Sequence, residues 1–177
     1  HKVTHTDAVI QLPLADPQAL GGAFQQLVVC QKFQTFCDLA EKYGIDRKDL
    51  IFDPLAMTIS TDPYAGNKTL GALRAIRQDL GCHTSLGISN VSFGLPARDA
   101  INGTFFAMAL TRGLSAAIMN PHSPDMMRTY HTYRALKGLD ESFASYIRYA
   151  ETIPVASATP AVGQGSTPAK KTAAEGN

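Results

Sequence analysis

Short apolar runs alternate with longer stretches of helical periodicity along this chain, and this alternation limits its fold more than any other feature. The short runs, bounded by Pro, Gly, Asp or Asn, predict strands at residues 7–14, 50–52, 84–88 and 115–119. Apolar residues that recur every three or four positions predict helices at residues 20–43, 67–80, 101–112, 124–136 and 140–150. Strands and helices that alternate through short connections form a parallel sheet, so the predicted fold class is α/β.

Periodicity alone does not separate an open doubly wound sheet from a closed barrel. Four strand–helix units are half of a (β/α) TIM-type barrel, which typically needs about 250 residues. This chain has 177 residues and begins at His1 rather than Met. We therefore expect residues 1–152 to be the last four strand–helix units of such a barrel.

The composition changes near residue 153. From Pro154 onward the chain consists mainly of Ala, Pro, Gly, Ser and Thr, and no periodic apolar face is present. Such a composition does not bury enough apolar surface to fold by itself. We expect residues 153–177 to be a flexible linker or tail.

The overall charge and the cysteine pattern exclude several classes of protein. Sixteen basic and fifteen acidic residues give a net charge of +1, which argues against nucleic acid or an anionic membrane surface as a partner. No apolar run approaches the roughly 20 residues that span a bilayer. Cys30, Cys37 and Cys82 form no C-x-x-C pair, and this odd number favours a reducing cytoplasm. The histidines lack the spacing of metal ligands, so no metal site is expected.

Asp53 follows the second predicted strand directly and precedes Pro54. One interpretation is structural, because an Asp-Pro step ends a strand. The other is functional, because a carboxylate is an acceptor that binds a fork of two N–H donors in a bidentate manner. The residue types alone favour neither interpretation.

The exit of the third predicted strand carries the densest polar signal of the chain. The sequence SNVSFGLP at residues 89–96 and then Arg98 follow the strand at once. An α/β protein builds its site from such side chains at the carboxyl edge of its sheet. Asn90 either closes a turn there or donates a hydrogen bond to a ligand. Asn120, at the exit of the fourth strand, has the same two interpretations.

These stretches resemble the pterin-binding domain of methyltetrahydrofolate-dependent methyltransferases, a group that includes cobalamin-dependent methionine synthases and corrinoid protein methyltransferases. The resemblance spans about residues 7–150. It is carried by the Asp53-Pro54 step, SNVSFGLP at 89–96, Arg98, Asn102, and AAIMNP at 116–121.

The resemblance implies a TIM-type barrel of the dihydropteroate synthase-like superfamily and the transfer of the N5-methyl group of methyltetrahydrofolate to a corrinoid cobalt. It implies that Asp53 holds the pterin, Asn90 hydrogen-bonds N5, and Arg98 and Asn120 lie at the folate. Ser89, Ser92 and Asn102 are interpreted as loop and cap residues. A donor at N5 is chemically sensible, because the nitrogen gains negative character as the methyl leaves.

The implied partners are the N-terminal half of the barrel, a cobalamin-binding domain or corrinoid protein, and a second copy of the chain. The family's first four strands carry further pterin contacts, and those strands have no counterpart here. Two alternatives stay open: a dihydropteroate synthase-like enzyme, and a non-catalytic pterin-binding fragment or split subunit. Against the first, Leu55 rather than Gly follows the Asp-Pro step, and Asn90-Val91 replaces the Arg-Lys pair of that enzyme.

Overall fold

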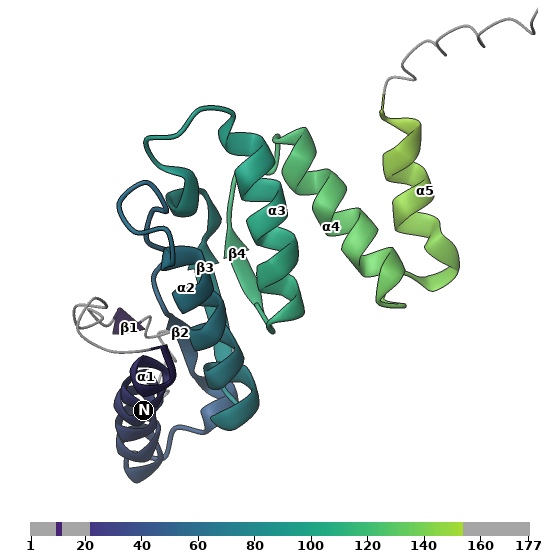
Figure 1. Cartoon of the computed structure of the whole chain (residues 1–177). Coiled ribbons are helices and arrows are strands. Elements are labelled where there is room, and N and C mark those ends of the chain that lie inside the picture. Colours follow the sequence, from purple (N-terminus) through teal and green to yellow (C-terminus); the bar gives the residue numbers. More distant parts are fainter. Residues whose placement is uncertain (1–9, 12–21, 154–177) are drawn as a thin grey trace, which may run out of the picture.

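The computed structural model describes residues 10–11 and 22–153, with side chains described from residue 31 onward. Strands and helices alternate through this part of the chain (Figure 1). In chain order the main elements are β1 (Ile10–Gln11), α1 (Gly22–Lys42), β2 (Ile51–Asp53), α2 (Ala65–Arg74), β3 (His83–Gly87), α3 (Arg98–Thr111), β4 (Ala116–Ile118), α4 (Pro124–Leu136) and α5 (Ala144–Glu151). Four short helical segments lie between them: η2 (Arg47–Asp49), η3 (Ala75–Asp79), η4 (Ile88–Ser92) and η5 (Glu141–Phe143).

The four strands form one parallel sheet in the order β1-β2-β3-β4. Phe52 of β2 pairs with Thr84 of β3, and Leu86 of β3 pairs with Ala117 of β4. The α/β class and the parallel order predicted from the sequence are confirmed. Of the predicted first strand only β1 is described, and the remainder of residues 7–14 and the predicted tail from residue 154 lie outside the described residues.

Local sequence signals account for the helix ends. Gly44 after α1 and Gly81 after η3 have φ angles of 78° and 71°, a left-handed conformation that glycine adopts without strain. Pro124 begins α4, where its missing N–H removes no helical hydrogen bond. These residues fix where each helix stops and the next strand begins.

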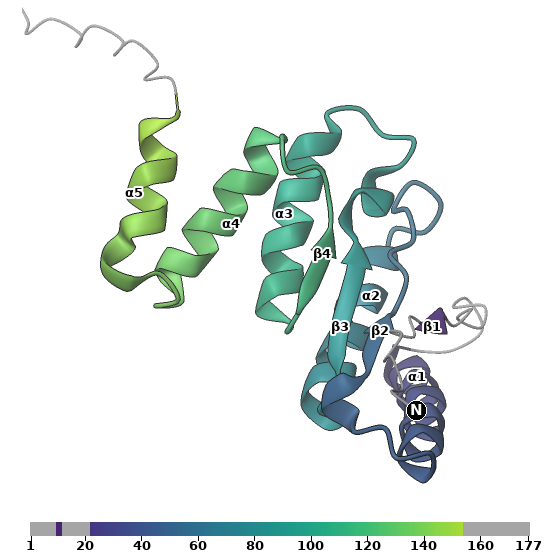
Figure 2. The ribbon, with the colours of Figure 1, turned by 180° about the vertical axis from the view of Figure 1, so that it is seen from behind.

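One face of the sheet packs against helices. In Figure 1 α2 and α3 lie in front of the strands, and in Figure 2 they lie behind them. Leu86 contributes to a core with Phe105 and Phe106 of α3, and Phe52 contributes to a second core with Phe33 of α1. The Phe33 and Phe52 ring centroids are 4.9 Å apart. Replacing either ring with alanine would cost about 3–5 kcal/mol of the free energy of unfolding.

The opposite face is open along β4. Successive strand residues point to opposite faces, so Ala116 and Ile118 point away from Ala117, which packs on the α3 core. Ile118 is 69% exposed. Strands of a parallel sheet are normally covered on both faces, and β4 is covered on only one within the described residues.

This open face predicts self-association of the isolated chain. An exposed apolar side chain such as Ile118 on an edge strand favours contact with a second copy. We expect sedimentation velocity to show dimers or larger species whose share rises with protein concentration. Ile118→Lys should shift the distribution toward monomer.

Leu136→Lys is the matched control, because Leu136 is 81% exposed but lies on α4, away from the sheet. A wild-type chain that sediments as a monomer at every concentration would contradict the prediction. So would an effect of Leu136→Lys that equals that of Ile118→Lys.

Candidate functional site

Three polar residues lie at or just after the carboxyl ends of three neighbouring strands. Asp53 is the last residue of β2, Asn90 lies in η4 directly after β3, and Asn120 follows β4 by two residues. Because the strands are parallel and adjacent, these ends lie at one edge of the sheet. The structure therefore brings the three residues to the same edge.

The Asp53 carboxylate is half-buried and forms a tight turn. Its Oδ1 accepts a hydrogen bond of 2.8 Å from the Leu55 N–H, and Leu55 has a φ angle of 60°. Burial raises the pKa of Asp53, and the Leu55 hydrogen bond offsets only part of that effect. Burial therefore disfavours the ionised form of this carboxyl, and a ligand with N–H donors would stabilise that form.

The Asn90 side chain is exposed, and its amide makes no hydrogen bond within the described part of the chain. Its backbone carbonyl accepts from the Phe93 N–H at 3.2 Å, so the backbone closes the turn without the side chain. Gly87 lies close to it, since a Cβ at position 87 would be 3.1 Å from Asn90 Nδ2. The amide of Asn90 thus lies beside the end of β3, with its donors and acceptor unused by any described residue.

Arg98 binds η4 rather than pointing freely into solvent. Its Nε donates to Ser92 Oγ at 3.0 Å, and its Nη2 donates to the Ser89 carbonyl at 2.7 Å. Ser92 Oγ in turn donates to the Ser89 carbonyl at 3.2 Å. Arg98, the first residue of α3, therefore stabilises η4, the turn that contains Asn90.

Residues 58–60, in the connection between β2 and α2, form hydrogen bonds with η4 and with Phe93, which follows it. Thr58 Oγ1 and Ser60 Oγ both donate to the Phe93 carbonyl, at 2.7 and 3.0 Å. The Ile59 N–H donates to the Val91 carbonyl at 3.0 Å. Residues 58–60 were not predicted from the sequence, and no local signal marks them, because the contacts join positions more than 30 residues apart.

The side chain of Asn120 stabilises a turn, a common role of Asn after a strand. Its Oδ1 accepts a hydrogen bond of 3.0 Å from the His122 N–H, which closes a turn after β4. The side chain is exposed, and its amide N–H groups make no hydrogen bond within the described residues.

One assignment from the sequence needs correction. Ser89 and Ser92 lie in η4, the turn between β3 and α3, where Ser92 is fully buried and is a hydrogen-bond acceptor for Arg98. Asn102 is not a cap residue. It lies one turn inside α3, is 5% exposed, and its Oδ1 has no hydrogen-bond partner within the described residues. The helix begins at Arg98 and its cap is Ala97, five residues before position 102.

Two classes of site find no support in the described residues. No group of three or more His, Cys, Asp or Glu side chains gathers there as a metal site would require. In the same part of the chain, no helix is both long and apolar enough to cross a membrane.

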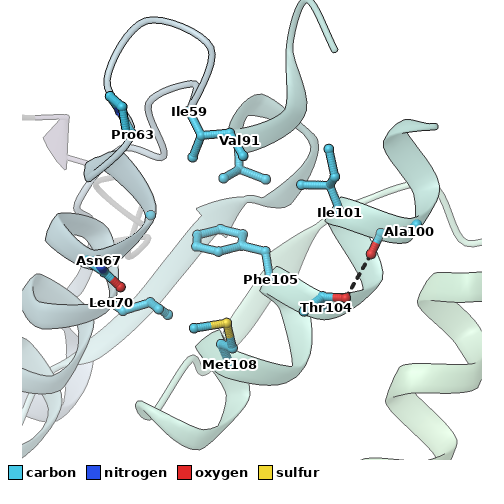
Figure 3. Close-up of a pocket in the computed structure, with 11 residues that line it drawn as sticks. Ile59, Pro63, Asn67, Leu70, Val91, Ala100, Ile101, Thr104, Phe105 and Met108 are labelled. Carbon is cyan, nitrogen blue, oxygen red and sulfur yellow. Dashed lines mark hydrogen bonds between the residues drawn. The ribbon is translucent and has the colours of Figure 1, made fainter. Parts of the chain in front are cut away.

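An apolar pocket of about 440 Å³ lies between α2 and α3 (Figure 3). Phe105 and Met108 from α3, Leu70 from α2 and Val91 from η4 point into it. The polar edge residues Asp53, Asn90 and Asn120 do not line it. We therefore place the candidate site at the carboxyl edge of the sheet, where the under-solvated carboxylate and the unpaired amide are.

Comparison with known proteins shows the family of the chain. The sequence profile of a family described as pterin binding enzyme matches residues 24–120, which include Asp53, Asn90, Arg98 and Asn120. The chain belongs to the pterin-binding enzyme family.

Several characterised relatives are methyltransferases or methionine synthases. The chain is 32% identical over 108 residues to methylcorrinoid:tetrahydrofolate methyltransferase of Eubacterium limosum, a match that covers 60% of this chain and 40% of the relative. It is 28% identical over 123 residues to methionine synthase of Mycobacterium tuberculosis, covering 66% of this chain and 10% of the relative. The match to methionine synthase of Mycobacterium leprae is 32% over 90 residues, or 47% of this chain and 8% of the relative. The chain thus spans less than half the length of each of these relatives.

The raised pKa of Asp53 predicts an unusual effect of Asp53→Asn on stability. The amide keeps the acceptor for the Leu55 N–H but removes the poorly solvated charge, so the variant should have a higher thermal midpoint at pH 7. A carboxyl whose pKa is raised on folding loses native stability as pH rises from its unfolded pKa through its folded pKa. The difference in midpoint should therefore disappear well below the ordinary pKa of 3.8.

Thermal unfolding of both proteins across this pH range checks the prediction. Asp99→Asn is a control, because Asp99 is an exposed acidic residue in the first turn of α3, where removal of its charge weakens the helix. A lower midpoint for Asp53→Asn than for the wild type at pH 7 would show that the buried charge is stabilised by its surroundings.

Proposed function

We propose that this chain is the C-terminal half of a pterin-binding barrel that transfers a methyl group between methyltetrahydrofolate and a corrinoid. The observation that carries the proposal is the unpaired amide of Asn90, held at the same sheet edge as the under-solvated Asp53 carboxylate. The names of the relatives support it, since one of them is a methylcorrinoid:tetrahydrofolate methyltransferase and two are methionine synthases.

Asp53 binds the pterin in this proposal. A pterin presents an amidine-like edge with neighbouring N–H donors, and a carboxylate is the side chain that accepts two of them together. One Asp53 oxygen is occupied by the Leu55 N–H at 2.8 Å but retains a second lone pair. Binding of a donor edge relieves the desolvation that raises the pKa of this carboxyl.

Asn90 acts on the transition state. When the methyl group leaves N5, that nitrogen gains negative character, and a donor placed there stabilises it most at the moment of transfer. An amide does not release a proton, so the proton that N5 finally carries comes through water. Because the same transition state serves both directions, the site also fits the reverse transfer, from a methylcorrinoid to tetrahydrofolate, that the name of the Eubacterium limosum relative describes.

Arg98 acts through η4, because its guanidinium is bonded to Ser92 Oγ and to the Ser89 carbonyl. It also places a positive charge beside the edge where the folate would lie. Asn120 borders the same edge and offers its amide N–H groups to the ligand. Asn120 thus positions the folate, and Arg98 positions the turn from which Asn90 meets N5.

A corrinoid supplies the cobalt centre, and the methyl group moves between this cobalt and N5. The names of the relatives support a corrinoid that is carried by a cobalamin-binding domain or a corrinoid protein. In this arrangement residues 153–177 are the linker that follows residues 1–152. The open face of β4, with Ile118 69% exposed, is where the first four strands of the barrel would close over the sheet.

Asn90→Ala and Asp53→Ala should separate catalysis from binding. In the protein joined to the first four strands, Asn90→Ala should slow methyl transfer by about 10²-fold or more while folate binding weakens less. Asp53→Ala should mainly abolish folate binding, because it leaves the donor edge of the pterin without its acceptor. Stopped-flow corrinoid methylation beside folate titration measures both effects.

Asn67→Ala is the matched control, since Asn67 lies on α2 at the apolar pocket and away from the sheet edge. It should change neither rate nor affinity. Transfer at the wild-type rate by Asn90→Ala would remove the assigned role. A complete protein that instead condenses a pterin pyrophosphate with p-aminobenzoate would replace the proposal with a dihydropteroate synthase-like function.

The positioning role of Arg98 predicts a distinct result for Arg98→Lys. A single ammonium group does not reproduce the two-point contact with η4, so transfer should slow by about tenfold or more as Asn90 loses its position. Arg112→Lys, at the opposite end of α3, should have no such effect.

A double-mutant cycle with Ser92→Ala tests the route of the effect. If Arg98 acts through η4, the two substitutions remove the same contact and their effects on the rate are not additive. Additive effects would show that Arg98 acts on the folate directly.

A further inference from the structure

Two buried cysteines face each other at the end of the sheet opposite to the candidate site. The Sγ atoms of Cys37 in α1 and Cys82, which directly precedes β3, are 3.4 Å apart. Both residues are 0% exposed and both are free thiols. A disulfide bond requires a sulfur–sulfur distance of about 2.05 Å, so a small approach of the two side chains is enough to form one.

The surroundings keep this pair dry and oriented. Phe33, Phe52 and Ile76 pack around the two sulfurs in the core beneath α1. Cys82 Sγ donates to the Leu80 carbonyl at 3.6 Å, and burial raises the pKa of Cys82 to about 12. Cys82 therefore stays protonated at neutral pH.

Arg47 covers the pair from the solvent side. Its Nη1 donates to the Leu80 carbonyl at 3.3 Å, the same carbonyl that Cys82 contacts. Its Nε forms an ion pair with Glu41 of α1. An oxidant therefore reaches the sulfurs through a local opening of α1 rather than through a permanent channel.

We propose that Cys37 and Cys82 are an oxidation site that closes to a reversible intramolecular disulfide in the presence of a hydroperoxide. The Cys37 sulfur attacks the hydroperoxide, the O–O bond breaks, and an alcohol or water leaves, so that Cys37 becomes a sulfenic acid. The Cys82 thiol then passes its proton to the hydroxyl of the sulfenic acid as its sulfur attacks the Cys37 sulfur, so that the S–O bond breaks, the S–S bond forms and water leaves. Two electrons pass from the two sulfurs to the peroxide.

The bond would join α1 to the start of β3 across 45 positions of sequence. Closing a loop of this length restricts the unfolded chain and stabilises the folded one. The link lies at the N-terminal end of β3, whereas η4 and Asn90 lie at its C-terminal end. Oxidation should therefore change stability and leave the geometry of the candidate site unchanged, so this inference does not depend on the proposed function.

The test begins with the full 177-residue chain and hydrogen peroxide. The oxidised protein should lose two hydrogen atoms in mass and two reactive thiols under denaturing conditions. Peptide mapping without reductant should join the peptides that contain Cys37 and Cys82. The thermal midpoint should rise by about 10 °C, the scale expected for a loop closure of this kind, and dithiothreitol should reverse the change.

Cys30→Ser is the matched control, since Cys30 lies in the same helix. It should keep both the cross-link and the rise in midpoint, whereas Cys37→Ala and Cys82→Ala should each lose both. A disulfide that involves Cys30 or two chains would overturn the proposal. So would oxidation of either sulfur without a link, or a link that leaves the midpoint unchanged. The peptide map of the wild-type chain decides the pairing even if a cysteine variant fails to fold.

Discussion

β3 is hydrogen-bonded to a parallel strand on each side, and the candidate site depends on that pairing. Since β2, β3 and β4 run in the same direction, the residues that follow them emerge at one edge. Asp53, Asn90 and Asn120 are 30 or more positions apart in sequence, and strand direction alone brings them together. A single antiparallel strand in place of β3 would send Asn90 to the other end of the sheet.

Strand pairing brings η4 to the edge, but it does not fix the conformation of η4. That conformation depends on polar contacts from two sides: the guanidinium of Arg98, and the backbone and hydroxyl donors of residues 58–60. The contacts go to backbone carbonyls of η4 and of Phe93, and to Ser92 Oγ, so they hold the turn and leave the Asn90 amide unused. A donor held in advance stabilises a developing charge without reorganisation at the moment of reaction.

The sequence predicts those parts of the structure that local physics decides. Strand ends at Asp53 and after Leu86, helix ends at Gly44 and Gly81, and the bounds of α4 follow from residue types within a few positions. Contacts across long separations do not follow in this way. The bond from Thr58 to the Phe93 carbonyl and the meeting of Cys37 with Cys82 arise only when the strands pair, and no spacing in the sequence marks them. The partners of Arg98 in η4 lie only six and nine positions away, but residue types do not give the direction of its guanidinium, so these contacts were not predicted either.

The two ends of the sheet differ in what their buried groups contribute to stability. At the amino end, the Cys37 and Cys82 sulfurs lie in an apolar core and leave no strongly polar group without a partner. At the carboxyl end, Asp53 carries a charge that burial disfavours, and Asn102 has a buried oxygen without a partner within the described residues, which costs about 1–3 kcal/mol. Unfavourable burial of polar groups persists in a native fold where a site needs it and the surrounding packing compensates for it. These costs therefore differ between the two ends: the described groups at the amino end lie in apolar packing, and the carboxyl end, where we propose the site, carries the unfavourable burial of polar groups.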